Sequence, residues 1–349
     1  MNKKIILSVS CFVLINFLLS CSATNTLTLK VTEPAPVLLN KNTTKIAVIN
    51  RSIPDKKHEV LDAIDKILTV EGKELDKIGS NTVISSLREE LLKNNKITSV
   101  IVLDSVASKK YGFDQFSDEL SWQKINEICV KNNVDAIYEL SFFDTDSNIS
   151  YKNYTTEIKN NLGIKIPAVE HEVTVSTLIK SGWRIYDNNY KVISDVYSDS
   201  KVVELKGRGI NPVKAFETIK TRKDAVLSVS RDMGRIYANR ILPYSIRVSR
   251  DYYVKGTTNF EIGKRRAQAG EWDSAAELWL LETNNKKAKI AGRACYNMGI
   301  ISEINGDIET ALKWVTKSYT DYNDKNALRY IKILKNRKIK NEQLKRETN

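Results

Sequence analysis

A pattern of small and large residues recurs after 36 positions near the carboxyl end of this 349-residue chain. The segment "GEWDSAAELW" begins at Gly270, and "GDIETALKWV" begins at Gly306. The register matches four pairs of positions: Gly263 with Gly299, Gly270 with Gly306, Ala275 with Ala311, and Trp279 with Val315. Small residues let two helices approach closely, and a bulky residue fills the space beside them. The pattern therefore predicts two helical hairpins that stack on each other.

These positions resemble tetratricopeptide repeats, which place a small residue in the first helix, a glycine in the turn, and an alanine and a bulky apolar residue in the second helix. An unrelated pair of helical hairpins is the alternative. The resemblance implies that the first helices line a groove for a protein partner. We therefore expect partner contacts from five residues of the first helices: Asn259, Lys264, Arg266, Asn297 and Ser302. The basic segment that follows predicts a helix capping the stack, which completes a repeat domain over residues 251–349.

The first 20 residues predict a signal peptide, because Lys3 and Lys4 precede an apolar run that is short for a membrane span. Its end, "LLSC", resembles the lipobox of bacterial lipoproteins. The resemblance implies cleavage before Cys21, a lipid on the thiol of Cys21, and, with Ser22 next in the chain, an outer-membrane position facing the periplasm. A plain secretory signal that contains a cysteine is the alternative.

Residues 21–44 predict a lipidated tether and an extended arm, since Pro34 and Pro36 exclude a central strand. Over residues 45–250 the pattern predicts an α/β domain: a mixed sheet with flanking helices, built first from crossovers and then from long antiparallel strands. We expect a two-residue turn at Asn188–Asn189 and one long helix over residues 213–241. The fold class is thus an α/β domain followed by an all-α repeat domain.

Several segments of residues 45–250, among them "KIAVINRS", "CVKNNVDAIYELSFF" and "WRIYDNNYKVISD", look like successive elements of the curli-transport and penicillin-binding-protein-activator lipoproteins. The whole chain more closely resembles an uncharacterised family of Gram-negative lipoproteins that is described as a domain of unknown function. The segments that carry this resemblance are "SVSRDMGRIYANRILPY" and "SRDYYVKGTTNFEIGKRRAQAGEW". The resemblance implies a place in the cell envelope and supplies no mechanism.

The sequence contains no recognised catalytic, metal or cofactor motif. Cys129 and Cys295 lie on apolar faces of predicted helices and are expected to be buried. The two histidines, His58 and His171, are far apart in the sequence, so we expect no metal site. We predict that the chain is not an enzyme and uses no cofactor.

The formal net charge is +13, which raises the question of nucleic-acid binding. A lipidated periplasmic protein does not normally meet nucleic acid, and no aromatic residues interleave with the basic ones in a binding motif. The cations gather in the last predicted helix and could face anionic lipid headgroups, an acidic partner or solvent.

These features predict an outer-membrane-anchored, periplasm-facing lipoprotein that acts as an adaptor and binds a protein partner of the cell envelope through its helical repeats. The alternative is an envelope enzyme that acts on peptidoglycan or glycan through an unfamiliar site with a carboxylate such as Glu139 or Asp144.

Overall fold

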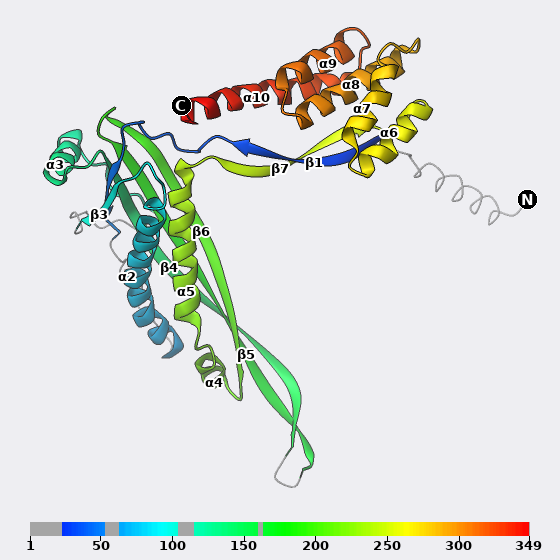
Figure 1. The fold of residues 1–349 in the computed structure, drawn as a ribbon. Helices are drawn as coiled ribbons and strands as arrows, with labels where there is room; N and C mark the ends of the chain where they lie inside the picture. The colour runs from blue at the N-terminus through cyan, green and yellow to red at the C-terminus, as the bar shows by residue number, and fades with distance from the viewer. Residues whose placement is uncertain (1–22, 53–62, 104–114, 160–162, 349) are drawn as a thin grey trace, which may run out of the picture. The chain divides into compact units, whose positions relative to one another are not determined.

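The computed structural model describes residues 23–52, 63–103, 115–159 and 163–348, which form two compact units (Figure 1). The sheet unit contains Ala35–Leu242, and the helical unit combines the described residues before Ala35 with those after Leu242. The predicted fold class is confirmed: a mixed sheet with flanking helices is followed by a helical region. No helix in the described ranges is long and apolar enough to cross a membrane.

Five strands form the sheet of the sheet unit, in the order β3-β2-β4-β5-β6. Strand β2 is parallel to both β3 and β4, whereas β4, β5 and β6 are antiparallel. The strands are β2 (Lys45–Asn50), β3 (Ser99–Leu103), β4 (Ala136–Lys159), β5 (Lys165–Asp187) and β6 (Val192–Gly209). The parallel part arises from helical crossovers and the antiparallel part from hairpins, as the sequence pattern predicts.

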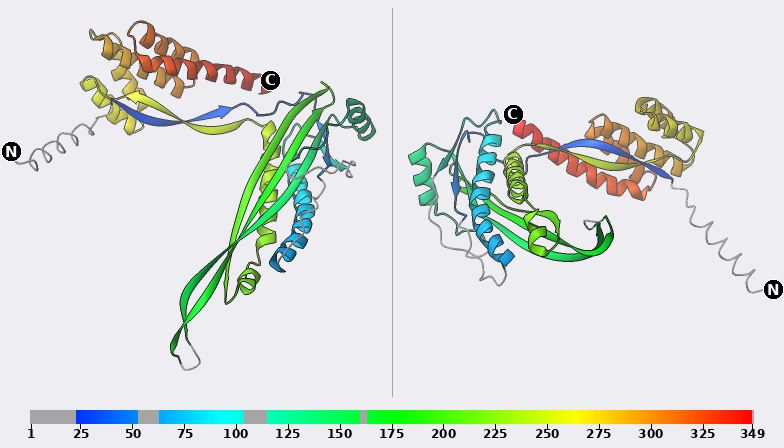
Figure 2. Two further views of the ribbon diagram at one scale, coloured as in Figure 1. Left: turned by 180° about the vertical axis from the view of Figure 1, so that it is seen from behind. Right: turned by 90° about the horizontal axis from the view of Figure 1, so that it is seen from below.

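Strand β2 explains why this unit has helices on both faces of its sheet. Successive side chains of a strand point to opposite faces, and every side chain from Ile46 to Ile49 is fully buried. Ile46 and Val48 join the core under α2 (Ala63–Leu91) and α5 (Arg222–Ala238). Ala47 and Ile49 join the core under α3 (Trp122–Asn132) (Figures 1 and 2).

The long helix expected over residues 213–241 is wrong, because the chain breaks it into α4 (Pro212–Glu217), α5 and the 3₁₀ turn Asn239–Ile241. Helix α4 packs on the end of β6, where a Cβ on Gly207 would meet the carbonyl oxygen of Ala215 at 2.1 Å. Helix α5 packs instead on α2, so the chain must turn between the two contacts. The expected two-residue turn at Asn188–Asn189 is a four-residue turn, with Lys191 at φ 52°.

The helical unit contains five helices and a two-stranded antiparallel ribbon (Figure 1). Its helices are α6 (Thr258–Gln268), α7 (Trp272–Glu282), α8 (Ala288–Ile304), α9 (Ile308–Thr320) and α10 (Lys325–Thr348). The ribbon pairs β1 (Thr24–Glu33) with β7 (Tyr244–Tyr253) in continuous register. A two-stranded ribbon is marginal by itself, so its packing against the helices stabilises it.

The ribbon corrects two predictions about domain limits. Thr24–Glu33 is extended as expected of an arm, but it is not a tether, because it is a paired strand whose Leu27 is buried in the helical core. Val37, further along this segment, is buried in the sheet unit. The expected end of the α/β domain near Arg250 also moves to Leu242, since β7 pairs with β1 and packs on α8.

Candidate functional site

The two predicted hairpins are equivalent in the structure: α6–α7 and α8–α9 place the matched residues at the same contacts. A Cβ on Gly263 would meet the indole of Trp279 at 2.6 Å, and a Cβ on Gly299 would meet Val315 at 2.2 Å. Ala275 and its counterpart in α9 are fully buried. Each glycine therefore lets the bulky residue of the following helix pack directly on the first helix.

The turn glycines of the repeat also have a common backbone requirement. Gly270 has φ 88° and Gly306 has φ 80°, values that residues with a Cβ rarely adopt. Each glycine accepts this conformation directly after the first helix of its hairpin. The repeat is therefore a true structural repeat in its helix packing and in its turns.

The side of α8 that was expected to be an open groove carries the β1–β7 ribbon instead (Figures 1 and 2). The side-chain amide of Asn297 donates to the carbonyl oxygen of Tyr253 at 2.7 Å and accepts from its backbone N–H at 2.7 Å. An asparagine amide can satisfy both backbone groups of one residue because it carries a donor and an acceptor. The side chain of Asn297 thus binds the last residue of β7 through the main chain of that residue.

Charged groups fix the ribbon at two further places. Arg250 of β7 binds Glu303 of α8 through two hydrogen bonds of 2.8 Å, and Glu303 also accepts from the hydroxyl of Tyr330 at 2.5 Å. Burial opposes the charged form of Arg250, but the hydrogen bonds and charge of Glu303 dominate and raise its pKa. At the other end of the ribbon, Glu33 accepts from Arg337 at 2.7 Å.

Aromatic rings pack at the junction of β7 with the helices. The rings of Tyr253 and Tyr296 meet edge to face with centroids 5.2 Å apart, and Tyr296 lies 5.2 Å from Tyr330. Burial raises the pKa of Tyr253 to about 12 and raises the pKa of Tyr330 as well. The phenols are therefore neutral packing and hydrogen-bonding groups near neutral pH.

The five residues predicted to contact a partner do not form one exposed surface. Asn297 is fully buried and Ser302 is 8% exposed, so the expectation that these two line an open groove is wrong. Ser302 donates to the carbonyl of Met298 within its own helix. The reason for the burial of Asn297 is strand β7, which packs on α8 and is itself paired with β1.

The other three predicted residues, all from α6, stay half-exposed. Asn259 donates to Glu282 at 2.7 Å, and Arg266 donates to the carbonyl of Ser274 at 2.8 Å. Both contacts reach the second helix of the same hairpin. Lys264 lies between them in sequence and is also half-exposed.

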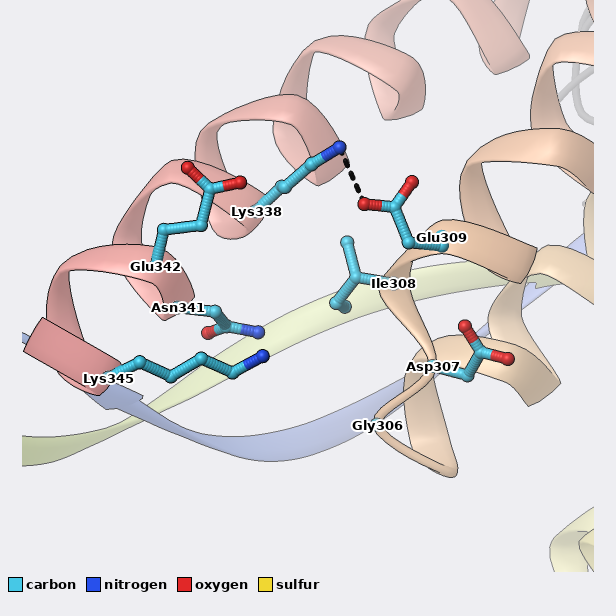
Figure 3. Close-up of a pocket in the computed structure, with 8 residues that line it drawn as sticks. All are labelled: Gly306, Asp307, Ile308, Glu309, Lys338, Asn341, Glu342 and Lys345. Atoms are coloured by element: carbon cyan, nitrogen blue, oxygen red, sulfur yellow. Dashed lines mark ion pairs between the residues drawn. The ribbon is translucent and has the colours of Figure 1, made fainter.

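A pocket of about 320 Å³ lies between the start of α9 and the last turns of α10 (Figure 3). Its residues are Gly306, Asp307, Ile308, Glu309, Lys338, Asn341, Glu342 and Lys345. Lys338 binds Glu309 at 2.5 Å across the pocket, and Asp307 caps α9 by accepting from the N–H of Thr310 at 2.9 Å. The hydrogen bonds from Thr310 lower the pKa of Asp307. The start of α9 is therefore already capped by the carboxylate of Asp307.

The carboxylates suggested for an enzymatic alternative are buried in the sheet unit. Glu139 is fully buried and binds Arg51 and Arg184, each at 3.1 Å. Ser117 donates to the same carboxylate at 2.5 Å, and Ser141 donates to it too. Both oxygens of Glu139 have internal partners, so this arrangement joins strands and offers no free base. Asp144 is 5% exposed.

The remaining predicted features lie as follows. Cys129 and Cys295 are buried, and burial raises the pKa of each thiol to about 11. His171 is half-exposed on β5. Cys21 and His58 lie outside the described residues. Within the described ranges, no group of three or more His, Cys, Asp and Glu side chains is placed to hold a metal ion.

A family model described as a domain of unknown function, DUF8603, matches residues 43–253, which is more than half of the chain. The chain belongs to the DUF8603 family. A second model, DUF6340, also described as a domain of unknown function, matches residues 261–336. The DUF8603 match begins just before β2 and ends at β7, so it includes a strand that packs with the helical unit. No curated protein matches the chain.

Solved structures similar to this DUF8603 chain are distant. One is the PelC dodecamer from Paraburkholderia phytofirmans, with 12% identity and a TM-score of 0.22 over 62% of this chain and 97% of that one. Another is a neuraminyllactose-binding hemagglutinin homolog from Helicobacter pylori, with 8% identity and a TM-score of 0.24 over 58% of this chain and 94% of that one. At these scores neither carries an argument about this chain.

Proposed function

We propose that the chain is a lipoprotein of the outer membrane that faces the periplasm and binds a protein partner of the cell envelope through tetratricopeptide-like repeats. It acts as an adaptor and not as an enzyme. The observation that carries the proposal is the contact between Asn297 and the main chain of Tyr253. A first helix of the repeats here binds an extended segment through its backbone, which is the way a repeat groove binds an extended partner.

The ribbon restricts where an external partner can dock. It covers the side of α8 that contains Asn297, whereas Asn259, Lys264 and Arg266 of α6 stay partly accessible. The partner site therefore centres on α6 in the first hairpin. Lys264 is the best probe, because Asn259 and Arg266 each bind within the hairpin.

Site-specific photocrosslinking tests this site in cells. A photoreactive amino acid at position 264 should give a protein adduct, whereas the same amino acid at Lys77, an exposed position of the sheet unit, should not. Lack of an adduct at position 264, or the same adducts at both positions, would contradict the proposed partner site.

The anchor rests on the "LLSC" sequence and on the resemblance of the chain to envelope lipoproteins, including the curli-transport and penicillin-binding-protein-activator lipoproteins. Acyl chains on Cys21 would hold the protein at the membrane, with about 0.8 kcal/mol for each buried methylene. Cells grown with an alkyne fatty acid should label the wild type and not the Cys21→Ala variant. Equal labelling of the two proteins would refute the lipid anchor.

A further inference from the structure

Helix α10 carries two groups of cations that differ in their surroundings. Arg337, Lys338 and Lys340 bind acidic residues of the helical unit: Arg337 and Lys340 bind Glu33 at 2.7 and 2.5 Å, and Lys338 binds Glu309 at 2.5 Å. These three side chains hold α10 against β1 and α9. Their charges are therefore paired with carboxylates of the same unit.

The second group lies on another side of α10. Lys325, Arg329, Lys332 and Lys335 are all exposed, and none of them forms an ion pair with a described residue. Their spacing of four, three and three residues places them within an arc of about 120° along about 15 Å of helix. We call these four residues the basic face of α10. Carboxylates of the helix, such as Glu342, come only after this stretch.

The position of Lys325 opposes helix stability. Lys325 is the first residue of α10, and the first turn contains no acidic residue. A cation at a helix N-terminus faces the positive end of the helix dipole, where carboxylates are favoured. The carboxylate of Asp324 already caps the helix start by accepting from the N–H of Asn326 at 3.0 Å. The charge of Lys325 is therefore not needed by the helix and stays accessible to a negatively charged partner.

Two large apolar side chains accompany the basic face. Leu328 is 40% exposed and Ile339 is 66% exposed, and helical spacing puts both on the same arc as the four cations. The pocket on α10 lies on a different arc, toward α9, so it does not offer a concave seat beside the basic face. A convex helix face with cations and a few exposed apolar side chains fits the headgroup region of an anionic membrane better than a peptide segment.

The chain outside the described residues agrees with this partner. Strand β1 begins at Thr24, three residues after Cys21, and β1 belongs to the same unit as α10. The proposed lipid anchor would therefore bring this unit to a membrane. We propose that the basic face of α10 binds anionic lipid headgroups and holds the helical unit on the membrane surface. The inference rests on the proposed anchor for its setting, but headgroup binding can be measured without the anchor.

Vesicle binding by a protein without the anchor tests the proposal. A chain that begins at Ser22 keeps every described helix and strand and lacks Cys21. Flotation should recover it with vesicles of phosphatidylcholine and phosphatidylglycerol, and not with vesicles of phosphatidylcholine alone. High salt should release it, because the attraction to the surface charge is screened.

Matched charge reversals assign the binding to α10. The variant Arg329→Glu, Lys332→Glu, Lys335→Glu should lose vesicle affinity by about 100-fold or more, since each cation near an anionic surface contributes about fivefold or more. The control variant Lys41→Glu, Lys77→Glu, Lys152→Glu has the same net charge and changes exposed lysines of the sheet unit. It should bind anionic vesicles nearly as the wild type does. Circular dichroism and urea unfolding of both variants would show that each is folded.

Three results would overturn the proposal: no binding of the wild type to anionic vesicles, equal loss in both variants, or a crosslinked protein partner that depends on the basic face in the absence of vesicle binding. Because the assay protein lacks Cys21, its outcome is separate from the fatty-acid labelling. Labelling without vesicle binding would keep the anchor and reject the basic face. Vesicle binding without labelling would do the reverse.

Discussion

The first helices of the two hairpins, α6 and α8, share the packing positions of the repeat and differ in what covers them. Helix α6 has three buried residues among its 11, whereas α8 has 12 among its 17. In the 36-residue register, Asn297 of α8 corresponds to the exposed Glu261 of α6, and Glu303 corresponds to Ala267. The ribbon meets both hairpins, since Tyr252 packs on Trp272 and Trp279 of α7, but among the described helices of the two hairpins only α8 holds it through buried polar side chains.

The buried ion pair between ribbon and α8 should give the largest effect. Arg250→Met would leave Glu303 buried without its cation, which should lower the free energy of unfolding of the helical unit by about 3–5 kcal/mol. Lys338→Met, which removes the more exposed pair with Glu309, should cost about 1 kcal/mol or less. Urea unfolding measures both. Similar losses in the two variants would mean that the ion pair between Arg250 and Glu303 does not stabilise the unit more than an exposed ion pair does.

Loss of the hydrogen bonds between Asn297 and the backbone of Tyr253 should give the next largest effect on stability. Asn297→Leu leaves the backbone N–H and carbonyl of Tyr253 without their partner, so we expect a loss of about 2–4 kcal/mol. Glu261→Leu changes the matching residue of α6, which is exposed, and should alter stability by about 0.5 kcal/mol or less. Comparable effects at the two positions would remove the distinction between α6 and α8.

The shared glycine contact should give an intermediate effect in both hairpins. Gly299→Ala forces a methyl group against Val315, and Gly263→Ala forces one against Trp279, with an expected cost of about 1–3 kcal/mol each. Val315→Ala should lessen the cost of Gly299→Ala and not that of Gly263→Ala. A double-mutant cycle measures this coupling, and additive effects of Gly299→Ala and Val315→Ala would contradict the packing described here.

Thiol reactivity should distinguish α6 from α8 with little change in stability. The raised pKa of Cys295, about 11, leaves about one thiol in a thousand ionised at pH 8, and the side chain is buried. Its counterpart in the register is the half-exposed Asn259. Asn259→Cys should react with a thiol reagent in the native protein, whereas Cys295 should react only after unfolding. A rapid native reaction of Cys295 would show that α8 is open.

The local patterns of the sequence predicted much of this fold. The apolar, β-branched run of β2 is typical of a buried strand, and the matched glycines predicted both hairpins. The alternation in "TNTLTLKVTE" was also visible: Leu27, Leu29 and Val31 alternate with polar residues, which is typical of a strand with one covered face. It argued against a tether for residues 24–33.

The pairing of that strand was not predictable from periodicity. Residues 24–33 pair with residues 244–253, and the sequence pattern of neither segment indicates which strand it pairs with. The candidate groove failed because β7, which lies shortly before the repeats in the sequence, packs on α8 at Asn297, and no local pattern predicted this contact. The sequence did contain one sign that Asn297 is buried. It lies one turn from Ala294 and Ile301, on an apolar side of the helix.

Hydrogen exchange in the ribbon tests most directly the claim that α8 holds a strand of its own chain. In the wild type, the amides of β7 and β1 should be protected together with those of α8, because they share one packed unit. Asn297→Leu should speed exchange in both strands, and Glu261→Leu should leave it unchanged. Fast exchange of residues 244–253 in the wild type, at the rate of an exposed loop, would show that the ribbon does not occupy this side of α8.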